Sequence, residues 1–198
     1  MEVIWEAFKG KNKYIAFALT LFILGALSGY FVFWHNPQFV LSNLEKLLGN
    51  ILKIGRAMTK SSRIYVTGLI FQNNIKALLL IMFGGAAFGT VPFFYILLNG
   101  FAVGLVMAMN FYHGKTLAFF LAATAPHGIL ELPAILVGGA FGLKTGVDLI
   151  FPRSQNRLAL LRENLQKSVF ALTLLVPVLF VAAFIEAVIT PHIAKFFI

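Results

Sequence analysis

Three ionisable residues lie within long apolar stretches of the sequence. His127 and Glu131 are four residues apart in the segment 124–146, and Glu186 lies in the last apolar stretch. Residues four apart share one face of a helix, so the imidazole and the first carboxylate should point the same way. Inside a membrane, such groups turn toward protein or a water-filled cavity and are paired or neutralised. The sequence therefore predicts an intramembrane polar site built on these three side chains.

Three kinds of chemistry fit this set of residues. The side chains could form a hydrogen-bonded network that fixes helix packing, carry protons or ions, or ligate zinc in a metal-dependent hydrolase. The sequence has no HExxH motif, no Cys and no Walker loop, and no Ser/His/Asp arrangement stands out. We therefore expect a non-enzymatic protein without cofactor or metal. If a metal does bind, its expected ligands are His127, Glu131 and Glu186.

The composition indicates the class of protein. Of 198 residues, 60% are hydrophobic and 12% are charged, which is too apolar for an ordinary soluble domain. Apolar stretches of about twenty residues favour a bundle of transmembrane helices over a barrel. The net charge of +9 comes from Lys and Arg between these stretches, which favours anionic lipid head groups over nucleic acid as the contact. We expect a multi-pass integral protein of the cell membrane.

The apolar stretches predict one all-α membrane domain over residues 1–198. Five spans are expected, at residues 14–34, 75–95, 96–112, 116–143 and 168–190. Residues 38–60 form an amphipathic pattern that is too polar to span, so this helix should lie on the membrane surface or contact a partner protein or second subunit. The basic segment 144–167 indicates a cytoplasmic connection.

Two prolines interrupt the fourth span. Pro126 suits the first turn of a new helix, with Thr124 as its cap, and Pro133 removes a backbone hydrogen bond further along. The segment from Thr116 is therefore either a half-helix or the first part of one long kinked span. The fold that we expect has a broken helix before His127.

Helix lengths place the two acids at a similar depth. Glu131 lies 13 residues before Lys144, and Glu186 lies 18 residues after Ser168. Antiparallel helices joined through the basic connection would hold the carboxylates within about 8 Å of the same depth. Two carboxylates close together in a low dielectric cannot both ionise cheaply, so one should be protonated or both should be neutralised by His127 or a cation.

Amides and glycines complete the expected arrangement. Amide side chains can bond between helices, and small residues at four-residue spacing let helices pack closely. Self-association of the chain is expected from the same glycine stripes. The amides predicted to join the polar site are Asn73 and Asn74, expected at the start of the second span, and Asn99. The expected packing glycines are Gly25, Gly29, Gly85, Gly89, Gly100, Gly104, Gly138, Gly142 and Gly146.

Four motifs from residue 71 onward carry a family resemblance. They are FQNN at 71–74, LLNGFAVG at 97–104, PHGILELPAILVGGAFGLKTG at 126–146 and IEAVITP at 185–191. With these motifs the chain resembles the stage II sporulation protein M family of prokaryotic multi-span membrane proteins. The resemblance implies a single all-helical membrane domain. It also implies a scaffold, because the namesake acts with two membrane-anchored proteins that remodel peptidoglycan and is not regarded as a hydrolase.

The expected function follows from the polar site and this resemblance together. We expect a protein that scaffolds or regulates a membrane complex, with membrane lipids, further copies of itself and other membrane-anchored proteins as its partners. His127, Glu131 and Glu186 would form its polar centre. The alternative is a small transporter or channel component for protons, ions or a lipidic solute that uses the same three side chains.

Overall fold

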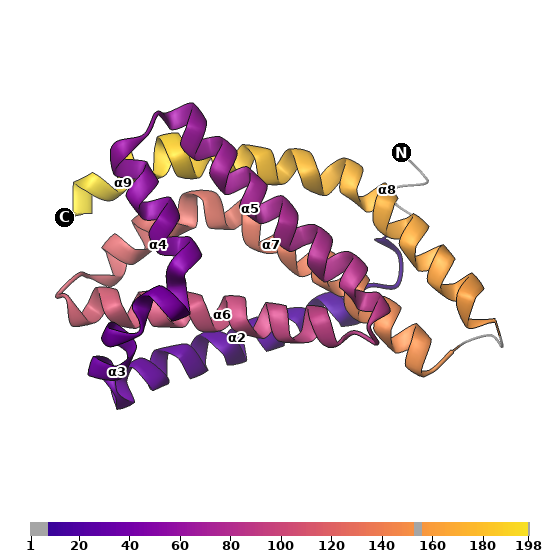
Figure 1. Cartoon of the computed structure of the whole chain (residues 1–198). Helices are drawn as coiled ribbons and strands as arrows, with labels where there is room; N and C mark the ends of the chain where they lie inside the picture. Colours follow the sequence, from indigo (N-terminus) through magenta and orange to yellow (C-terminus); the bar gives the residue numbers. More distant parts are fainter. Residues whose placement is uncertain (1–7, 153–155, 198) are drawn as a thin grey trace.

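Long helices packed side by side make up the fold (Figure 1). The computed structural model describes residues 8–152 and 156–197, and every regular element within them is helical. Five helical segments there are long and apolar enough to cross a membrane. They are Asn12–His35, Arg63–Ala86, Thr90–Tyr112, Leu117–Ile150 and Arg157–Phe197. The prediction of an all-α bundle with five spans is confirmed.

Helices α2 (Asn12–His35) and α6 (Thr90–Tyr112) touch backbone to backbone. A Cβ atom on Gly25 would lie 2.1 Å from the carbonyl oxygen of Leu97, so no larger residue fits. Gly29 meets α6 one turn further on in the same way, which shows that the two helices run parallel. From the α6 side, Gly100 and Gly104 make equally close contacts with α2.

A second set of close contacts joins α7 (Leu117–Ile150) to α5 (Arg63–Phe83) and the 3-10 turn after it, η1 (Gly84–Ala86). A Cβ atom on Gly142 would lie 2.0 Å from the carbonyl oxygen of Ile81. Gly89 has a φ of 77°, which favours glycine, and it turns the chain into α6 against Gly146. Of the remaining predicted glycines of this group, Gly85 faces the backbone of Gly142 at a distance that excludes a Cβ atom, whereas Gly138 meets the end of the Leu78 side chain, which can shift.

The predicted boundary between the second and third spans was wrong. Helix α5 starts at Arg63, so the predicted span 75–95 includes the turn that separates α5 from α6. Asn73 and Asn74 lie near the middle of α5 and do not begin it. The error arose because amides marked a break that the helix does not make, whereas the real turn is built from apolar residues and glycine. The other three predicted spans differ from the observed ones only at their ends.

The predicted helix break before His127 was also wrong. Helix α7 is continuous through Pro126 and Pro133, although Figure 1 shows that it is curved. The Thr116 hydroxyl caps its start by accepting a hydrogen bond from the Phe119 N–H at 3.1 Å. Thr124, which was expected to cap a new helix, instead donates its hydroxyl to a backbone carbonyl one turn earlier. Within a bundle, neighbouring helices and such hydroxyl contacts let a membrane helix tolerate proline.

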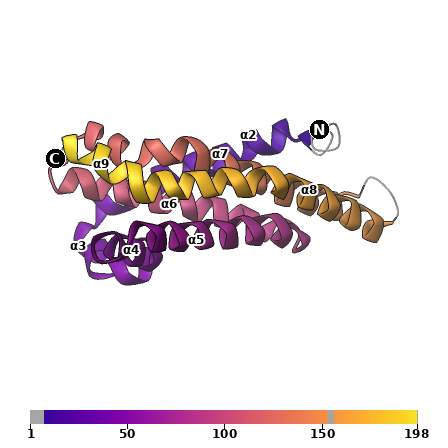
Figure 2. The same ribbon diagram turned by 90° about the horizontal axis from the view of Figure 1, so that it is seen from above.

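The amphipathic segment forms two helices, α3 (Pro37–Ser42) and α4 (Leu44–Lys60). Its apolar side packs on the bundle, where Leu48 belongs to one buried group with residues of α2 and α6. Further along, apolar residues of α4 pack against α5 and the C-terminal span. Figure 2 shows α3, α4 and α5 on one side of the bundle. The location of this segment at a membrane surface stays a prediction.

The last span begins with α8 (Arg157–Phe184) and continues through the π-helical turn η2 (Ile185–Ile189), α9 (Thr190–Ala194) and the 3-10 turn η3 (Lys195–Phe197). The segment predicted as a basic connection, 144–167, is mostly helical, because α7 extends to Ile150 and α8 starts at Arg157. Both helices therefore carry polar residues into the contact between them.

Three of these residues form what we call the Lys144 network: Lys144, Asp148 and Asn164. Each is at most 9% exposed. Lys144 is paired with Asp148, and the Asn164 amide donates a hydrogen bond to the Asp148 carboxylate at 2.9 Å. Lys11, just before α2, is also buried, and its ammonium lies 4.0 Å above the ring of Phe141. Burial and the nearby Lys144 cation lower the pKa of Lys11 to about 8.

Candidate polar site within the helix bundle

His127, Glu131 and Glu186, which we call the polar cluster, come together in the structure. One ligand atom from each lies within 4.8 Å of the others. The imidazole nitrogen Nε2 of His127 lies 3.9 Å from the carboxylate oxygen Oε2 of Glu186. These two side chains are 15% and 20% exposed, so the cluster is mostly shielded.

Local helix geometry explains this meeting. His127 and Glu131 are one turn apart on α7 and share a face. Glu186 lies in the π-helical turn η2 of the last span. A π turn inserts one extra residue into a helix, which locally changes the direction of its side chains, and such turns occur often at functional sites. The cluster is therefore formed where the last span departs from regular α geometry.

Thr190 also belongs to the site, and the sequence analysis did not predict it. Its hydroxyl oxygen lies 3.3 Å from His127 Nδ1, which fixes the direction of the imidazole ring. Thr190 follows Glu186 by four residues and lies within the IEAVITP motif, so helical spacing alone could have placed both on one face. The contact leaves Nε2 as the ring nitrogen that faces the Glu186 carboxylate.

The three predicted amides have different positions. Asn74 is 5% exposed and lies against the Glu131 carboxyl group, yet its Nδ2 has no hydrogen-bond partner among the described residues. Asn73 is more exposed and reaches Asn74 Oδ1 at 3.5 Å. Asn99 donates to a carbonyl of its own helix, that of Tyr95, at 3.0 Å.

Tyr95 is the second residue that the sequence analysis missed. Its side chain lies close enough to Glu131 to interact electrostatically, and it contacts Asn99 one turn further on. Of the predicted amides, the structure therefore brings Asn74 directly to the cluster, with Asn73 at its edge and Asn99 behind Tyr95. Since Asn74 lies near the middle of α5, the cluster lies near the middle of that helix along its length and not at one of its ends.

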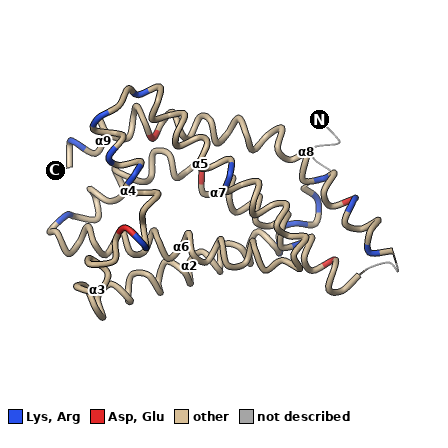
Figure 3. The backbone as a smooth tube through the Cα atoms, in the orientation of Figure 1, with Lys and Arg blue, Asp and Glu red and all other residues tan. Residues whose placement is uncertain are grey.

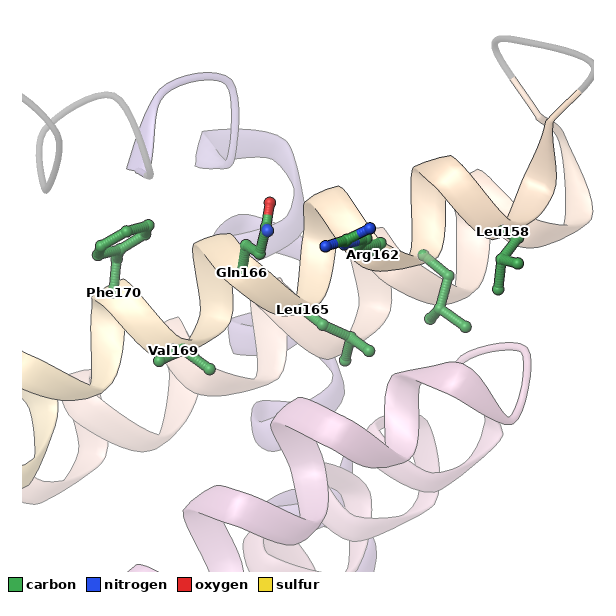
Figure 4. A pocket seen from close by; sticks show the side chains of 7 residues that line it. Leu158, Arg162, Leu165, Gln166, Val169 and Phe170 are labelled. Atoms are coloured by element: carbon green, nitrogen blue, oxygen red, sulfur yellow. The ribbon is translucent and has the colours of Figure 1, made fainter.

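A groove of about 740 Å³ elsewhere on the bundle is separate from this site. Its lining residues, shown in Figure 4, all come from α8 between Leu158 and Phe170. They are mostly apolar, and the groove ends about four helical turns before Glu186. The groove therefore does not connect with the polar cluster.

The cluster has the chemistry to hold a positive charge. Two carboxylates and an imidazole within 4.8 Å can share a proton or ligate a divalent cation, and Asn74 supplies a further polar side chain beside Glu131. Two ionised carboxylates in a low dielectric repel each other unless a cation or proton lies between them. The arrangement therefore fits a cation or proton site better than an uncharged structural contact.

Comparison with known proteins agrees with the fold. A curated relative, an uncharacterized protein of Methanocaldococcus jannaschii, is 33% identical over 128 residues, which cover 64% of this chain and 72% of the relative. No solved structure matches the chain. The model of the family "Stage II sporulation protein M" matches residues 18–191, which include the polar cluster, Thr190 and the interlocked glycines. The chain therefore belongs to the stage II sporulation protein M family of membrane proteins.

Proposed function

We propose that this chain is a non-enzymatic integral membrane protein that scaffolds or regulates a membrane protein complex. The observation that carries the proposal is a polar stripe on the outer face of α5. Gly68, Gln72 and Lys76 follow one another at four-residue spacing, and all three are exposed. Figure 2 shows that α5 lies at the outside of the bundle, and a Cβ atom on Gly68 would meet only open space.

Lys76 makes this stripe a poor surface for lipid. It lies 13 residues after Arg63 and 10 before Ala86, so it is about 15 Å or more from either end of its span. Most other Lys and Arg residues lie toward the helix ends and in α4 (Figure 3). A charged side chain near the centre of a bilayer costs at least about 3 kcal/mol unless it is paired or reaches water. Lys76 is too far from either end to reach the head groups, so it needs a partner.

The best partner is a transmembrane helix of another protein with an Asp or Glu at mid-depth. Opposite charges pair within membranes, and a small residue such as Gly68 lets a second helix approach closely. A second copy of this chain offers no such acid among its described residues. Glu45, Asp148 and Glu163 each pair with a basic residue, and Glu131 and Glu186 belong to the polar cluster.

The glycine stripes no longer argue for self-association. Gly25, Gly29, Gly100 and Gly104 are occupied by contacts within the chain, as are the predicted packing glycines of α7, Gly138, Gly142 and Gly146. Self-association therefore stays a prediction, and these packing glycines do not support it. The scaffold proposal relies on the α5 stripe instead.

The test is photo-crosslinking from position 72 in native membranes, followed by affinity purification. It compares wild type with Lys76→Met and with a matched control, Lys60→Met at the end of α4. We expect the crosslinked partner to carry a mid-span acid and to be at least tenfold depleted with Lys76→Met only. Combining Lys76→Glu with a basic residue at the partner's acid should restore capture. Equal capture by Lys76→Met, or crosslinks only to a second copy, would contradict the proposal.

The second candidate is a transporter or channel component for protons or ions, which the polar cluster favours. Ionisable groups inside a bundle frequently mark an ion path. The experiment is to measure proton and cation flux in vesicles that contain wild type, Glu131→Gln or the control Glu45→Gln, which is exposed on α4. Flux that is lost only with Glu131→Gln would replace the scaffold proposal. Vesicles without flux would eliminate this candidate.

A further inference from the structure

We infer that His127, Glu131 and Glu186 bind a divalent transition metal ion of the Zn²⁺ class, with Asn74 as the fourth ligand. The proposal concerns a site that the scaffold role neither uses nor requires. Imidazole nitrogen and carboxylate oxygen are ordinary zinc ligands, and four ligands are the usual number when the protein supplies all of them. The chain has no Cys, so the expected ligand set contains only nitrogen and oxygen.

The distances suit such an ion. Tetrahedral zinc with bonds of about 2.1 Å holds its ligand atoms about 3.4 Å apart. The three ligand atoms already lie within 4.8 Å of one another, and His127 Nε2 is 3.9 Å from Glu186 Oε2. Small side-chain rotations would therefore close the remaining distance without a change in the backbone.

The orientation of His127 also points to a cation. Metal-binding histidines almost always use their second ring nitrogen in a hydrogen bond that fixes the ring, and Nδ1 makes that contact with Thr190. If Nδ1 donates to the Thr190 hydroxyl oxygen, Nε2 presents a lone pair to the Glu186 carboxylate. Two acceptors then face each other, and the contact becomes favourable when a proton or a metal ion lies between them.

Asn74 provides an independent indication of a ligand. Its amide is 5% exposed and lies beside the Glu131 carboxyl group, but among the described residues its Nδ2 has no partner within hydrogen-bond geometry. A buried amide that leaves a donor unpaired is rare and costly. Within the described chain, the Asn74 oxygen accepts only a long hydrogen bond from Asn73 Nδ2, at 3.5 Å, so turning the amide to aim its oxygen at the cluster would exchange that weak contact for a bond to the ion. In that orientation Asn74 becomes an oxygen ligand.

Charge balance supports a divalent ion over a monovalent one. Two carboxylates carry two negative charges, and a divalent metal would make the complex of ion and carboxylates neutral. Neutrality matters near the middle of a bundle, where an uncompensated charge is expensive. The mixed nitrogen and oxygen ligands favour zinc or a neighbouring transition metal over Ca²⁺ or Mg²⁺, which take oxygen ligands almost exclusively.

The experiment starts with the full chain purified in detergent and stripped with a chelator. Zn²⁺ is added, excess ion is removed, and bound metal is measured by elemental analysis together with the melting temperature. We expect one ion per chain and a melting temperature that rises with Zn²⁺ concentration. Glu131→Gln and Glu186→Gln should each weaken binding at least 100-fold, and Thr190→Val should weaken it about 10- to 100-fold.

Matched controls separate a built site from adventitious binding. His113→Gln and Glu45→Gln remove the same kinds of side chain from exposed positions and should bind Zn²⁺ as wild type does. Lys76→Met should also bind normally, so the metal site and the scaffold role can fail separately. Should a glutamine variant not fold, Co²⁺ added to wild type still reports tetrahedral nitrogen and oxygen ligands by its visible spectrum. No zinc on wild type, or equal zinc on all variants, would overturn the proposal.

Discussion

Helix α7 carries two shielded polar groups that differ in how completely they are bonded. In the Lys144 network, opposite charges are paired and Asn164 bonds to the shared carboxylate. In the polar cluster, which begins about 20 Å away along α7, two acids lie near each other, and the contact between His127 and Glu186 is 3.9 Å long. The Asn74 Nδ2 has no hydrogen-bond partner among the described residues. Burying charged groups is expensive in both places, but only the Lys144 network has its charges paired by direct bonds.

This difference separates a structural role from a functional one. A buried network with all partners present holds its elements in a single arrangement. A group with unsatisfied donors and acceptors holds helices in place poorly and is better suited to binding a ligand. The Lys144 network therefore fits a role in the framework, and the polar cluster remains the site that we propose the framework positions.

The largest expected effect comes from breaking the Lys144 network. Asp148→Ala leaves the Lys144 ammonium buried without its carboxylate, and removing one partner of a buried ion pair costs about 3 to 5 kcal/mol. The measurement is the free energy of unfolding in detergent. As a control, Lys144→Met combined with Asp148→Leu and Asn164→Leu removes both charges and the amide that bonds to them, and should be much closer to wild type in stability. A loss below about 1 kcal/mol for Asp148→Ala would contradict a framework role.

A smaller effect is expected from pH, through Lys11. Its pKa is about 8 in the fold against 10.5 for an ordinary lysine, because of burial and the nearby cations Lys144 and Lys167. Between these values the unfolded chain binds more protons, so stability rises with pH above 8, by on the order of 1 kcal/mol per pH unit. Thermal unfolding of wild type and Lys11→Met from pH 7 to 10 checks this. Parallel pH curves for the two proteins would show that Lys11 does not titrate in this range.

The smallest effect is expected from the polar cluster itself. In chelator-treated protein, Glu186→Gln should change the free energy of unfolding by less than about 1 kcal/mol, because the 3.9 Å contact with His127 is too long for a hydrogen bond and the amide can still bond. The measurement is denaturant unfolding of Glu186→Gln compared with that of Asp148→Asn, the matching acid-to-amide substitution in the Lys144 network. A loss as large as that of the Lys144 network would mean that the cluster fixes helix packing and that the contrast between the two regions is false.

The fold class and the meeting of the two acids could be predicted because both follow from helix length. Apolar stretches of about twenty residues identify spans, and counting residues from the connection between α7 and α8 places Glu131 and Glu186 at similar depths. The same counting could not find the α5–α6 turn, because nothing polar marks it. Phe88 and Gly89 form it with positive φ values, which only the surrounding helices determine.

The satisfied network was missed for a different reason. Lys144, Asp148 and Asn164 lie in a segment whose net charge is typical of a solvent-exposed connection, so the pattern predicted exposure. Their burial depends on how α7 and α8 pack, which periodicity does not reveal. Thr190, in contrast, was within reach of the spacing rule. The sequence therefore predicts which residues of one helix share a face better than it predicts what covers that face.

The parallel contact between α2 and α6 limits how this molecule can move. Where four glycines bring two backbones together, neither helix can slide or rotate without collision. The pair must therefore shift as one rigid body. An opening toward the acids therefore cannot arise between α2 and α6, and the π-helical turn that carries Glu186 is the place near the acids where regular helix geometry is already interrupted.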